Sequence, residues 1–374
     1  MEVFVFILVI VALIVVHEFG HFAAAKLSGM RVDEFGIGYP PRALTVAKVD
    51  ETSYTLNWLP FGGFVKIYGE DPATTTAQTR LATGQAADPR AFSGKNRFLQ
   101  ALVLVAGVAM NLLFAYLLIT GALVAGTPRA LMPSEVAGAR DLALTVASVL
   151  PGTPAARAGL VPGDALISAR DAAGTWRASD PESFSAFVAE SNGHDIRLTI
   201  RRSGLERTLT AAPETGIVPG APARYALGVE VAPVGVVPLS LGKALAEGLT
   251  LTGGAIALTA AGLWHFFSGV FTLSANLSQV AGPVGIAGAV GTASAQGLGD
   301  LLSLMAVISI NLALINLIPI PALDGGRLLF VAIESAIRRP IAPEVARAVN
   351  AAGFALLILL MAVVTFHDIY RIVG

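Results

Sequence analysis

Four long apolar stretches, separated by polar segments, dominate the sequence. A helix that crosses a hydrocarbon core about 30 Å thick needs roughly 20 apolar residues, and each stretch is about that long. The stretches cover residues 3–25, 98–124, 301–320 and 348–366. This pattern predicts a multi-pass α-helical membrane protein with four transmembrane helices.

The segment between the first two stretches, residues 27–96, contains short runs that predict β-structure. The runs 54–58 and 60–67 mix apolar and polar residues, and the second includes the pair Gly62-Gly63. Such runs, bounded by Gly, Pro and Asn, are typical of strands and hairpins. We therefore expect a membrane-associated β-hairpin in this segment.

A polar segment at residues 127–240 predicts one inserted α+β domain with its core at residues 144–232. Strands are expected at 146–149, 196–200 and 207–211, and a helix at 181–191. The segments 151–155 and 158–167, which include Ala158-Gly159-Leu160 and Gly163-Asp164, resemble the part of PDZ domains that closes the peptide-carboxylate groove. A PDZ fold binds an extended peptide by adding it to a sheet edge.

Residues 241–299 are harder to place. The run 248–264 lacks charge, but Lys243, Glu247 and His265 flank it, and small residues dominate the rest of the segment. A full span is therefore marginal, and we expect an amphipathic, surface-lying or re-entrant segment.

Together these patterns divide the chain into eight segments. They are 1–26 (first span), 27–96 (loop with the hairpin), 97–126 (second span), 127–240 (PDZ-like domain), 241–299 (amphipathic or re-entrant), 300–325 (third span), 326–347 (loop) and 348–374 (fourth span and tail).

Composition agrees with a membrane protein and narrows the chemistry. The chain is 54% hydrophobic and 14% charged, and its mean hydropathy is +0.69. The net charge of -1 provides no basic field for nucleic acid. Since the sequence has no cysteine, any metal must be held by His, Asp or Glu.

The first span ends in the motif H-E-x-x-H, formed by His17, Glu18 and His21. On a helix, two histidines four residues apart project from one face and can reach a single ion. Zinc held by two imidazoles and a carboxylate keeps a position for water, and a nearby carboxylate can take the water's proton. Ionisable residues in a span are costly and mark functional sites, so this motif predicts a peptide-hydrolysing metal site.

Asp324 is the expected third ligand. It follows the third span in the segment 316–325, where Pro319 and Pro321 break the helix and leave the backbone free to turn the carboxylate toward the metal. Because His21 and Asp324 both end spans, the first and third spans must cross in the same direction. One reversing crossing lies between them, which is a further reason not to expect a full span at 248–264.

These motifs resemble the site-2 protease family of intramembrane zinc metalloproteases, in particular its PDZ-containing bacterial branch with the regulator of sigma-E protease. The resemblance rests on the H-E-x-x-H, the N-x-x-P-x-P-x-L-D-G of residues 316–325, the PDZ-like module and the hairpin run 60–66. Residues 282–286 also look like a family element, without an assigned chemistry. The sigma-E regulator carries two tandem PDZ domains, whereas residues 128–240 leave room for about one.

The resemblance implies a role for each matching residue. His17, His21 and Asp324 would bind Zn²⁺, Glu18 would be the general base, and Asn316 would contact the scissile peptide or its oxyanion. Further candidates for substrate binding are Gly62, Gly63 and Phe64, at a hairpin edge that can pair with an unwound substrate, and Asn111, which matches a polar family position and equally fits a helix-packing asparagine.

Charge predicts the orientation, and the resemblance suggests the substrates. Lys26, Arg31, Arg97 and the pair Arg338-Arg339 fall on the metal-site side, which the positive-inside rule assigns to the cytoplasm. The PDZ-like domain would then be extracytoplasmic, in a bacterial inner membrane. Expected partners are lipid and single-span proteins, such as anti-sigma factors or remnant signal peptides, with peptide segments at the PDZ-like domain.

Two other functions fit the same residues. In a metal transporter, His17, His21 and Asp324 would line a permeation path, and Glu18→Gln would leave transport intact. In an inactive scaffold, the PDZ-like module would hold peptides and the purified protein would lack zinc.

Overall fold

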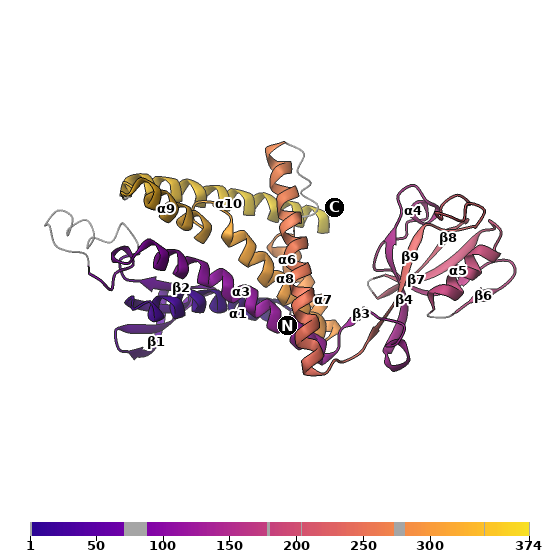
Figure 1. The fold of residues 1–374 in the computed structure, drawn as a ribbon, viewed down its shortest axis with the longest axis horizontal. Coiled ribbons are helices and arrows are strands. Elements are labelled where there is room, and N and C mark those ends of the chain that lie inside the picture. Colours follow the sequence, from indigo (N-terminus) through magenta and orange to yellow (C-terminus); the bar gives the residue numbers. More distant parts are fainter. Residues whose placement is uncertain are drawn as a thin grey trace. The chain divides into compact units, whose positions relative to one another are not determined.

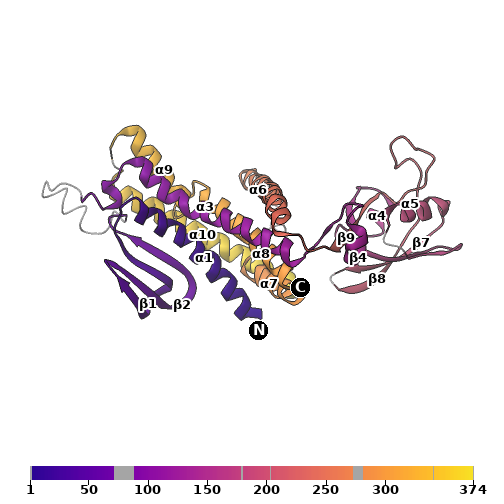
Figure 2. The same cartoon turned by 60° about the horizontal axis from the view of Figure 1, so that its bottom comes forward.

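The computed structural model describes residues 2–70, 88–177, 180–202, 204–272, 281–339 and 341–373. The chain forms two compact units, one made of residues 1–122 and 240–374 and the other of residues 123–239 (Figures 1 and 2). The second unit falls on the segment where the sequence predicts an inserted domain.

The first unit is mainly helical. Its helices are α1 (Glu2–Leu27), α3 (Arg97–Ala125), α6 (Leu241–Phe271), α7 (Pro283–Gln296), α8 (Leu298–Leu317), α9 (Asp324–Ile337) and α10 (Pro343–Val373), with a short 3-10 turn at Phe92–Gly94. Five of these helices, α1, α3, α6, α8 and α10, are long and apolar enough to cross a membrane, where the sequence predicts four. Three of the five, α1, α3 and α10, contain predicted spans, and α8 covers the fourth up to Leu317, three residues before its predicted end.

The additional candidate is α6. The weak apolar run at 248–264 lies inside one continuous helix of 31 residues, and its length alone is sufficient to cross a bilayer. In Figure 1, however, α6 runs steeply across the direction of α3 and α10 rather than alongside them. The helix is therefore longer than the sequence indicates, whereas its course differs from that of the helices around the metal-site motif.

The β-structure of the first unit is a bent hairpin of β1 (Val32–Val49) and β2 (Thr52–Ile67). Phe35 of β1 pairs with Val65 on one side and with Tyr54 on the other, so the first half of β1 lies between two arms of β2. The arm 63–67 thus forms an edge of the sheet, and no described strand pairs with its outer side. Gly62-Gly63 lies at the bend between the arms, whereas the turn that joins β1 to β2 is at residues 50–51.

Helix α1 packs over its whole length. Near its start, Val9 and Leu13 are buried against Val290 of α7 and apolar residues of α8. Near its end, Ala25 belongs to a second cluster that also contains Ile67 of β2 and residues of α3 and α9. Consequently the second half of α1 is fixed between the sheet, α3 and α9, which is where the H-E-x-x-H motif lies.

The glycines at residues 282–286 accommodate a carboxylate from the last helix. The buried Asp368 of α10 accepts a hydrogen bond of 2.8 Å from the backbone N–H of Gly285 in the first turn of α7. A Cβ atom on Gly282 would lie 2.7 Å from an oxygen of Asp368. The glycines therefore allow Asp368 to cap α7, since a carboxylate stabilises the amino end of a helix. This gives the segment a structural role that its sequence does not reveal.

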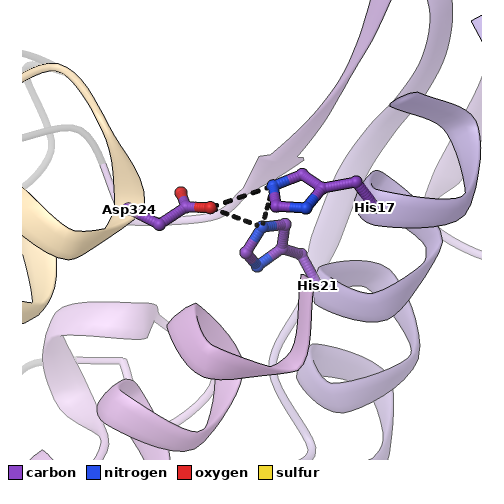
Figure 3. Close-up of side chains that lie close together, drawn as sticks. All are labelled: His17, His21 and Asp324. Carbon is purple, nitrogen blue, oxygen red and sulfur yellow. Dashed lines mark hydrogen bonds and ion pairs between the residues drawn. The ribbon is translucent and has the colours of Figure 1, made fainter. Parts of the chain in front are cut away.

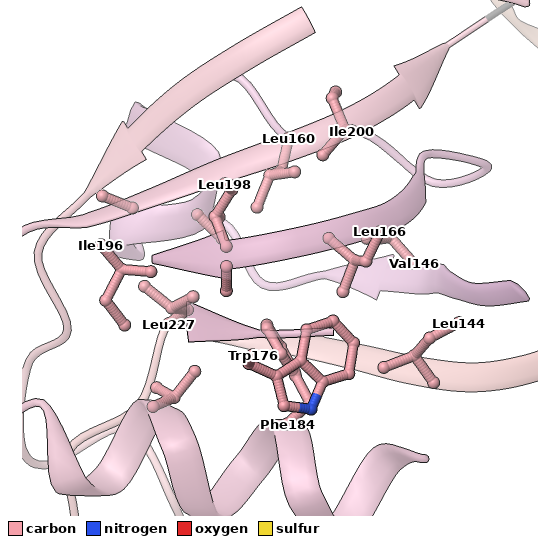
Figure 4. Packing of buried hydrophobic residues seen from close by; sticks show 14 residues of the cluster. Leu144, Val146, Leu160, Leu166, Trp176, Phe184, Ile196, Leu198, Ile200 and Leu227 are labelled. Carbon is pink, nitrogen blue, oxygen red and sulfur yellow. The ribbon is translucent and has the colours of Figure 1, made fainter. Parts of the chain in front are cut away.

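The second unit is a β-sheet with a helix packed against it. Its strands follow the order β3-β9-β4-β5-β7-β8, and β6 pairs with β5. The elements are β3 (Pro128–Ala130), a 3-10 turn (Val136–Gly138), β4 (Arg140–Val149), α4 (Pro154–Arg157), β5 (Ala165–Arg170), β6 (Thr175–Trp176), α5 (Pro181–Glu190), β7 (Ile196–Arg202), β8 (Leu205–Ala211) and β9 (Val229–Val236). Trp176 and Phe184 lie at the centre of its core (Figure 4).

A buried ion pair holds the turn before β5. The Asp164 side chain is fully buried and accepts hydrogen bonds of 2.6 and 2.7 Å from the Nε and Nη2 atoms of Arg202. Burial alone would raise the pKa of Asp164, but the hydrogen bonds from Arg202 and from the Val161 N–H outweigh it and hold the pKa below its usual value. The Gly163-Asp164 motif thus fixes a loop of this unit through a charged anchor.

Candidate metal centre

His17 and His21 lie one turn apart on α1 and are both buried, with 6% and 7% of their surface exposed. Their Nε2 atoms are 3.2 Å apart. The apolar sequence around them keeps this part of the chain helical, which places both imidazoles on the same face. As a result, two nitrogen atoms point at one small region of space.

Asp324 points at the same region from a segment about 300 residues further along the chain. Its Oδ2 atom lies 2.9 Å from Nε2 of His17 and 3.2 Å from Nε2 of His21 (Figure 3). Within the described parts of the chain, these three residues are the one group identified as able to hold a metal ion. The structure thus brings together the three side chains that the sequence proposes as ligands.

The glycines after Asp324 allow the chain to double back onto the end of α8. A Cβ atom on Gly325 would lie 2.2 Å from the carbonyl oxygen of Ile318, and one on Gly326 would lie 2.3 Å from that of Ile320. Both separations are far below van der Waals contact, so only glycine fits at either position. The turn after the third span can therefore be tight enough to start α9 with Asp324 facing α1.

The geometry of this cluster suits zinc. Bonds of about 2.0–2.2 Å to nitrogen and oxygen place donor atoms about 3.3–3.5 Å apart at the corners of a tetrahedron. The three donor atoms here are 2.9 to 3.2 Å apart, slightly closer than that spacing. Two buried imidazole nitrogens facing each other and one partly buried carboxylate oxygen form a donor set that a divalent cation would complete. The residues present therefore fit a zinc ion.

Helix α3 orients His21 and leaves room for its imidazole ring. The Nδ1 atom of His21 lies 2.8 Å from the carbonyl oxygen of Val103 and donates its proton there, which leaves Nε2 unprotonated for a metal. A Cβ atom on Gly107 would lie only 2.3 Å from that Nε2 atom. Gly107, a residue with no side chain to suggest a role in the sequence, thus leaves the room on α3 that the ring of His21 occupies.

Asn111 lies one turn beyond Gly107 and is fully buried against His17. The side-chain amide nitrogen of Asn111 is 3.2 Å from Nδ1 of His17. The side-chain amide oxygen, Oδ1, has no hydrogen-bond partner within the described structure. Exchanging the amide oxygen and nitrogen lets the Nδ1–H of His17 donate to Asn111 and leaves Nε2 free. This position suits a residue that orients a ligand better than one that touches a substrate.

Asn316 and Glu18 border the same region. The amide nitrogen of Asn316, in the last turn of α8, lies 3.4 Å from Nε2 of His17. Glu18 is partly buried on α1, and a Cβ atom on Gly63 would lie 3.5 Å from its Cγ atom. The sheet edge at residues 63–67 therefore passes directly beside the carboxylate that follows His17.

Known proteins are similar to this chain over nearly its whole length. The zinc metalloprotease RasP of Oceanobacillus iheyensis is 30% identical over 445 residues, which cover 98% of this chain and 98% of the relative. RasP of Geobacillus kaustophilus is 29% identical and covers 98% and 97%. A Nostoc sp. protein is 33% identical over 96% of this chain and 93% of its own, and its name also contains the words zinc metalloprotease. The chain is a membrane metalloprotease that uses zinc.

The family assignment is more specific. The model of peptidase family M50 matches residues 5–360, a range that includes both H-E-x-x-H and the segment around Asp324. The chain therefore belongs to peptidase family M50, the site-2 proteases, and the resemblance found in its sequence is confirmed.

Proposed function

We propose that His17, His21 and Asp324 are the zinc ligands of this protease and that Glu18 is its general base. The observation that carries the proposal is the convergence of two buried imidazole nitrogens and one partly buried carboxylate oxygen within about one ligand spacing, beside the carboxylate of the next residue, Glu18. In this arrangement zinc would supply a Lewis acid and lower the pKa of a bound water to about 7.

The remaining steps fall to side chains of this protein. Glu18 would take the proton of the attacking water and deliver it to the leaving amine nitrogen. Asn316 would donate an amide N–H to the oxygen on which negative charge develops, because its nitrogen lies beside the ligand His17. Asn111 would fix the ring of His17 rather than bind substrate.

The sheet edge at residues 63–67 is the proposed substrate-binding element. A transmembrane substrate hides its carbonyl groups in helical hydrogen bonds, so it must become extended before hydrolysis. An edge strand can supply replacement hydrogen bonds, and this one runs beside Glu18. Gly62 and Gly63 would let the substrate approach closely, with Phe64 next to them on the arm.

We expect Val65→Pro to reduce cleavage about fivefold, because loss of one backbone hydrogen bond worth about 1 kcal/mol changes a rate by roughly this factor. The matched control is Val46→Pro, on the exposed opposite edge of the same sheet. Initial rates with a single-span reporter in detergent would measure both. Equal rates for Val65→Pro and wild type would contradict the proposed pairing.

We further propose that α1, α3, α8 and α10 span the membrane, with the metal centre toward the cytoplasm and residues 123–239 on the other side. The steep course of α6 favours a surface-lying or re-entrant helix over a fifth span (Figure 1). For residues 123–239 we propose a PDZ-like role, in which the module binds extended segments of substrates and controls their access.

The proposed substrates are single-span membrane proteins, of the anti-sigma factor or remnant signal peptide class, in a bacterial inner membrane. Their cleavage can be tested by co-expressing a tagged single-span reporter with wild-type protein or Asp324→Ala. We expect processing by the wild type alone and loss of stoichiometric zinc from the variant. Processing by Asp324→Ala at the wild-type rate, or unchanged zinc content, would refute this assignment.

A further inference from the structure

An ion pair links the first turn of α9 to the sheet. Arg327 lies three residues after Asp324, and its guanidinium contacts the carboxylate of Glu70, which follows the arm 63–67. The Glu70 side chain is 14% exposed, against 45% for Arg327. Burial raises the pKa of Glu70 above its ordinary value, while Arg327 opposes the rise and favours the ionised form.

The backbone around Glu70 is held in place. Its N–H donates to the carbonyl oxygen of Ile67 over 3.2 Å, and the N–H of Tyr68 donates to that of Arg31 over 2.9 Å. On the other side, the N–H of Phe92 donates to the carbonyl oxygen of Tyr68 over 2.8 Å. The ion pair thus joins α9 to a segment whose backbone is itself held by hydrogen bonds.

A second ion pair lies on the same face of α9. Glu334, seven residues after Arg327, is 2.7 Å from Arg97 at the start of α3. Residues seven apart on a helix share a face, so the two pairs determine both the place of α9 and its rotation about its axis. The rotation sets the direction in which Asp324 points, and Arg327 is the attachment nearer to it.

We propose that Glu70 and Arg327 are positioning residues for the metal centre, because their ion pair holds the first turn of α9 to the end of the substrate-binding arm. This inference rests on the proposed role of Asp324 as a ligand. This pair links the arm 63–67, which would bind the substrate, to the first turn of α9, which carries the proposed zinc ligand Asp324.

The alternative is an ordinary ion pair at the surface, which contributes little to structure or activity. Arg90 provides the matched control, since its pair with Glu51 over 2.9 Å has no contact with α9 and both of its side chains are about half exposed. The test compares full-length Glu70→Gln, Arg327→Gln and Arg90→Gln proteins with the double variant that exchanges Glu70→Arg and Arg327→Glu.

Two measurements separate positioning from general stability. Titration with Zn²⁺ gives the metal affinity, and the visible absorption of the Co²⁺-loaded protein reports the ligand geometry. For Glu70→Gln and Arg327→Gln we expect about tenfold weaker metal binding, as is found when outer partners of metal ligands are lost. We also expect an altered Co²⁺ spectrum and a lower kcat with little change in KM. The exchanged pair should recover part of each loss.

The inference is overturned if both single variants match Arg90→Gln in metal affinity and Co²⁺ spectrum, whether or not their thermal stability falls. It is also overturned if the exchanged pair recovers nothing while remaining as stable as wild type. Failure of the proposed function would look different, because Asp324→Ala would then keep wild-type metal affinity.

Discussion

Replacing Glu18 by Gln is expected to lower kcat/KM by a factor of about 10² to 10⁴ while zinc content stays the same. Gln has nearly the shape of Glu but cannot accept a proton, and loss of a general base has an effect of this size. The difference corresponds to roughly 3 to 5 kcal/mol of transition-state stabilisation. Rates of cleavage of a transmembrane peptide in detergent, with metal analysis of the same samples, would measure it.

The zinc content is the control in this experiment. Since Glu18 is not among the three converging donors, the variant should bind one equivalent of zinc like the wild type. A variant that kept more than a third of the wild-type rate would show that another group takes the proton. Loss of zinc would instead indicate that Glu18 helps to hold the metal.

Replacing Gly107 by Ala is expected to abolish both zinc binding and proteolysis. The added methyl group would lie 2.3 Å from Nε2 of His21, against the face of its ring, and would push the ring out of the position in which it can bind the metal. His21 cannot turn away without losing its 2.8 Å hydrogen bond to Val103. Zinc stoichiometry and the cleavage rate both measure this effect, and circular dichroism would verify that the helices remain folded.

Gly121→Ala, on the same helix, is the matched control. A methyl group there would meet Leu302 at 3.6 Å, which is ordinary van der Waals contact. This variant should therefore bind zinc and cleave at the wild-type rate. If Gly107→Ala bound zinc as tightly as Gly121→Ala, zinc binding would not require the ring of His21 in the position described here.

The sequence predicts the helical part of the fold well where apolar runs are free of charge. It underestimates the length of α6, because Lys243 and Glu247 interrupt the pattern at the start of a helix that continues through them. It also misses β1, which is a single strand of 18 residues and contains the pair Pro40-Pro41, a signal that normally argues against a strand. Pairing with both arms of β2 outweighs that local preference.

The residues of the candidate site also differ in whether the sequence reveals them. His17, His21 and Asp324 are recognisable because ionisable groups are rare in apolar segments and their spacing suits a metal. Gly107 has no side chain to signal a role, although its position four residues before Asn111 places both on one helix face. Glu70 and Arg327 cannot be paired from sequence, because 257 positions separate them and each resembles an ordinary surface charge.

The distance along the chain between the donors affects how the enzyme matures. His17 and Asp324 are separated by 307 positions, so a nascent polypeptide that has not reached the aspartate holds only two of the three donors. Protease activity would therefore appear late in biosynthesis, after most of the helices have been synthesised. Metal uptake would then act as a checkpoint for assembly, because an ion that binds only the finished arrangement also stabilises it.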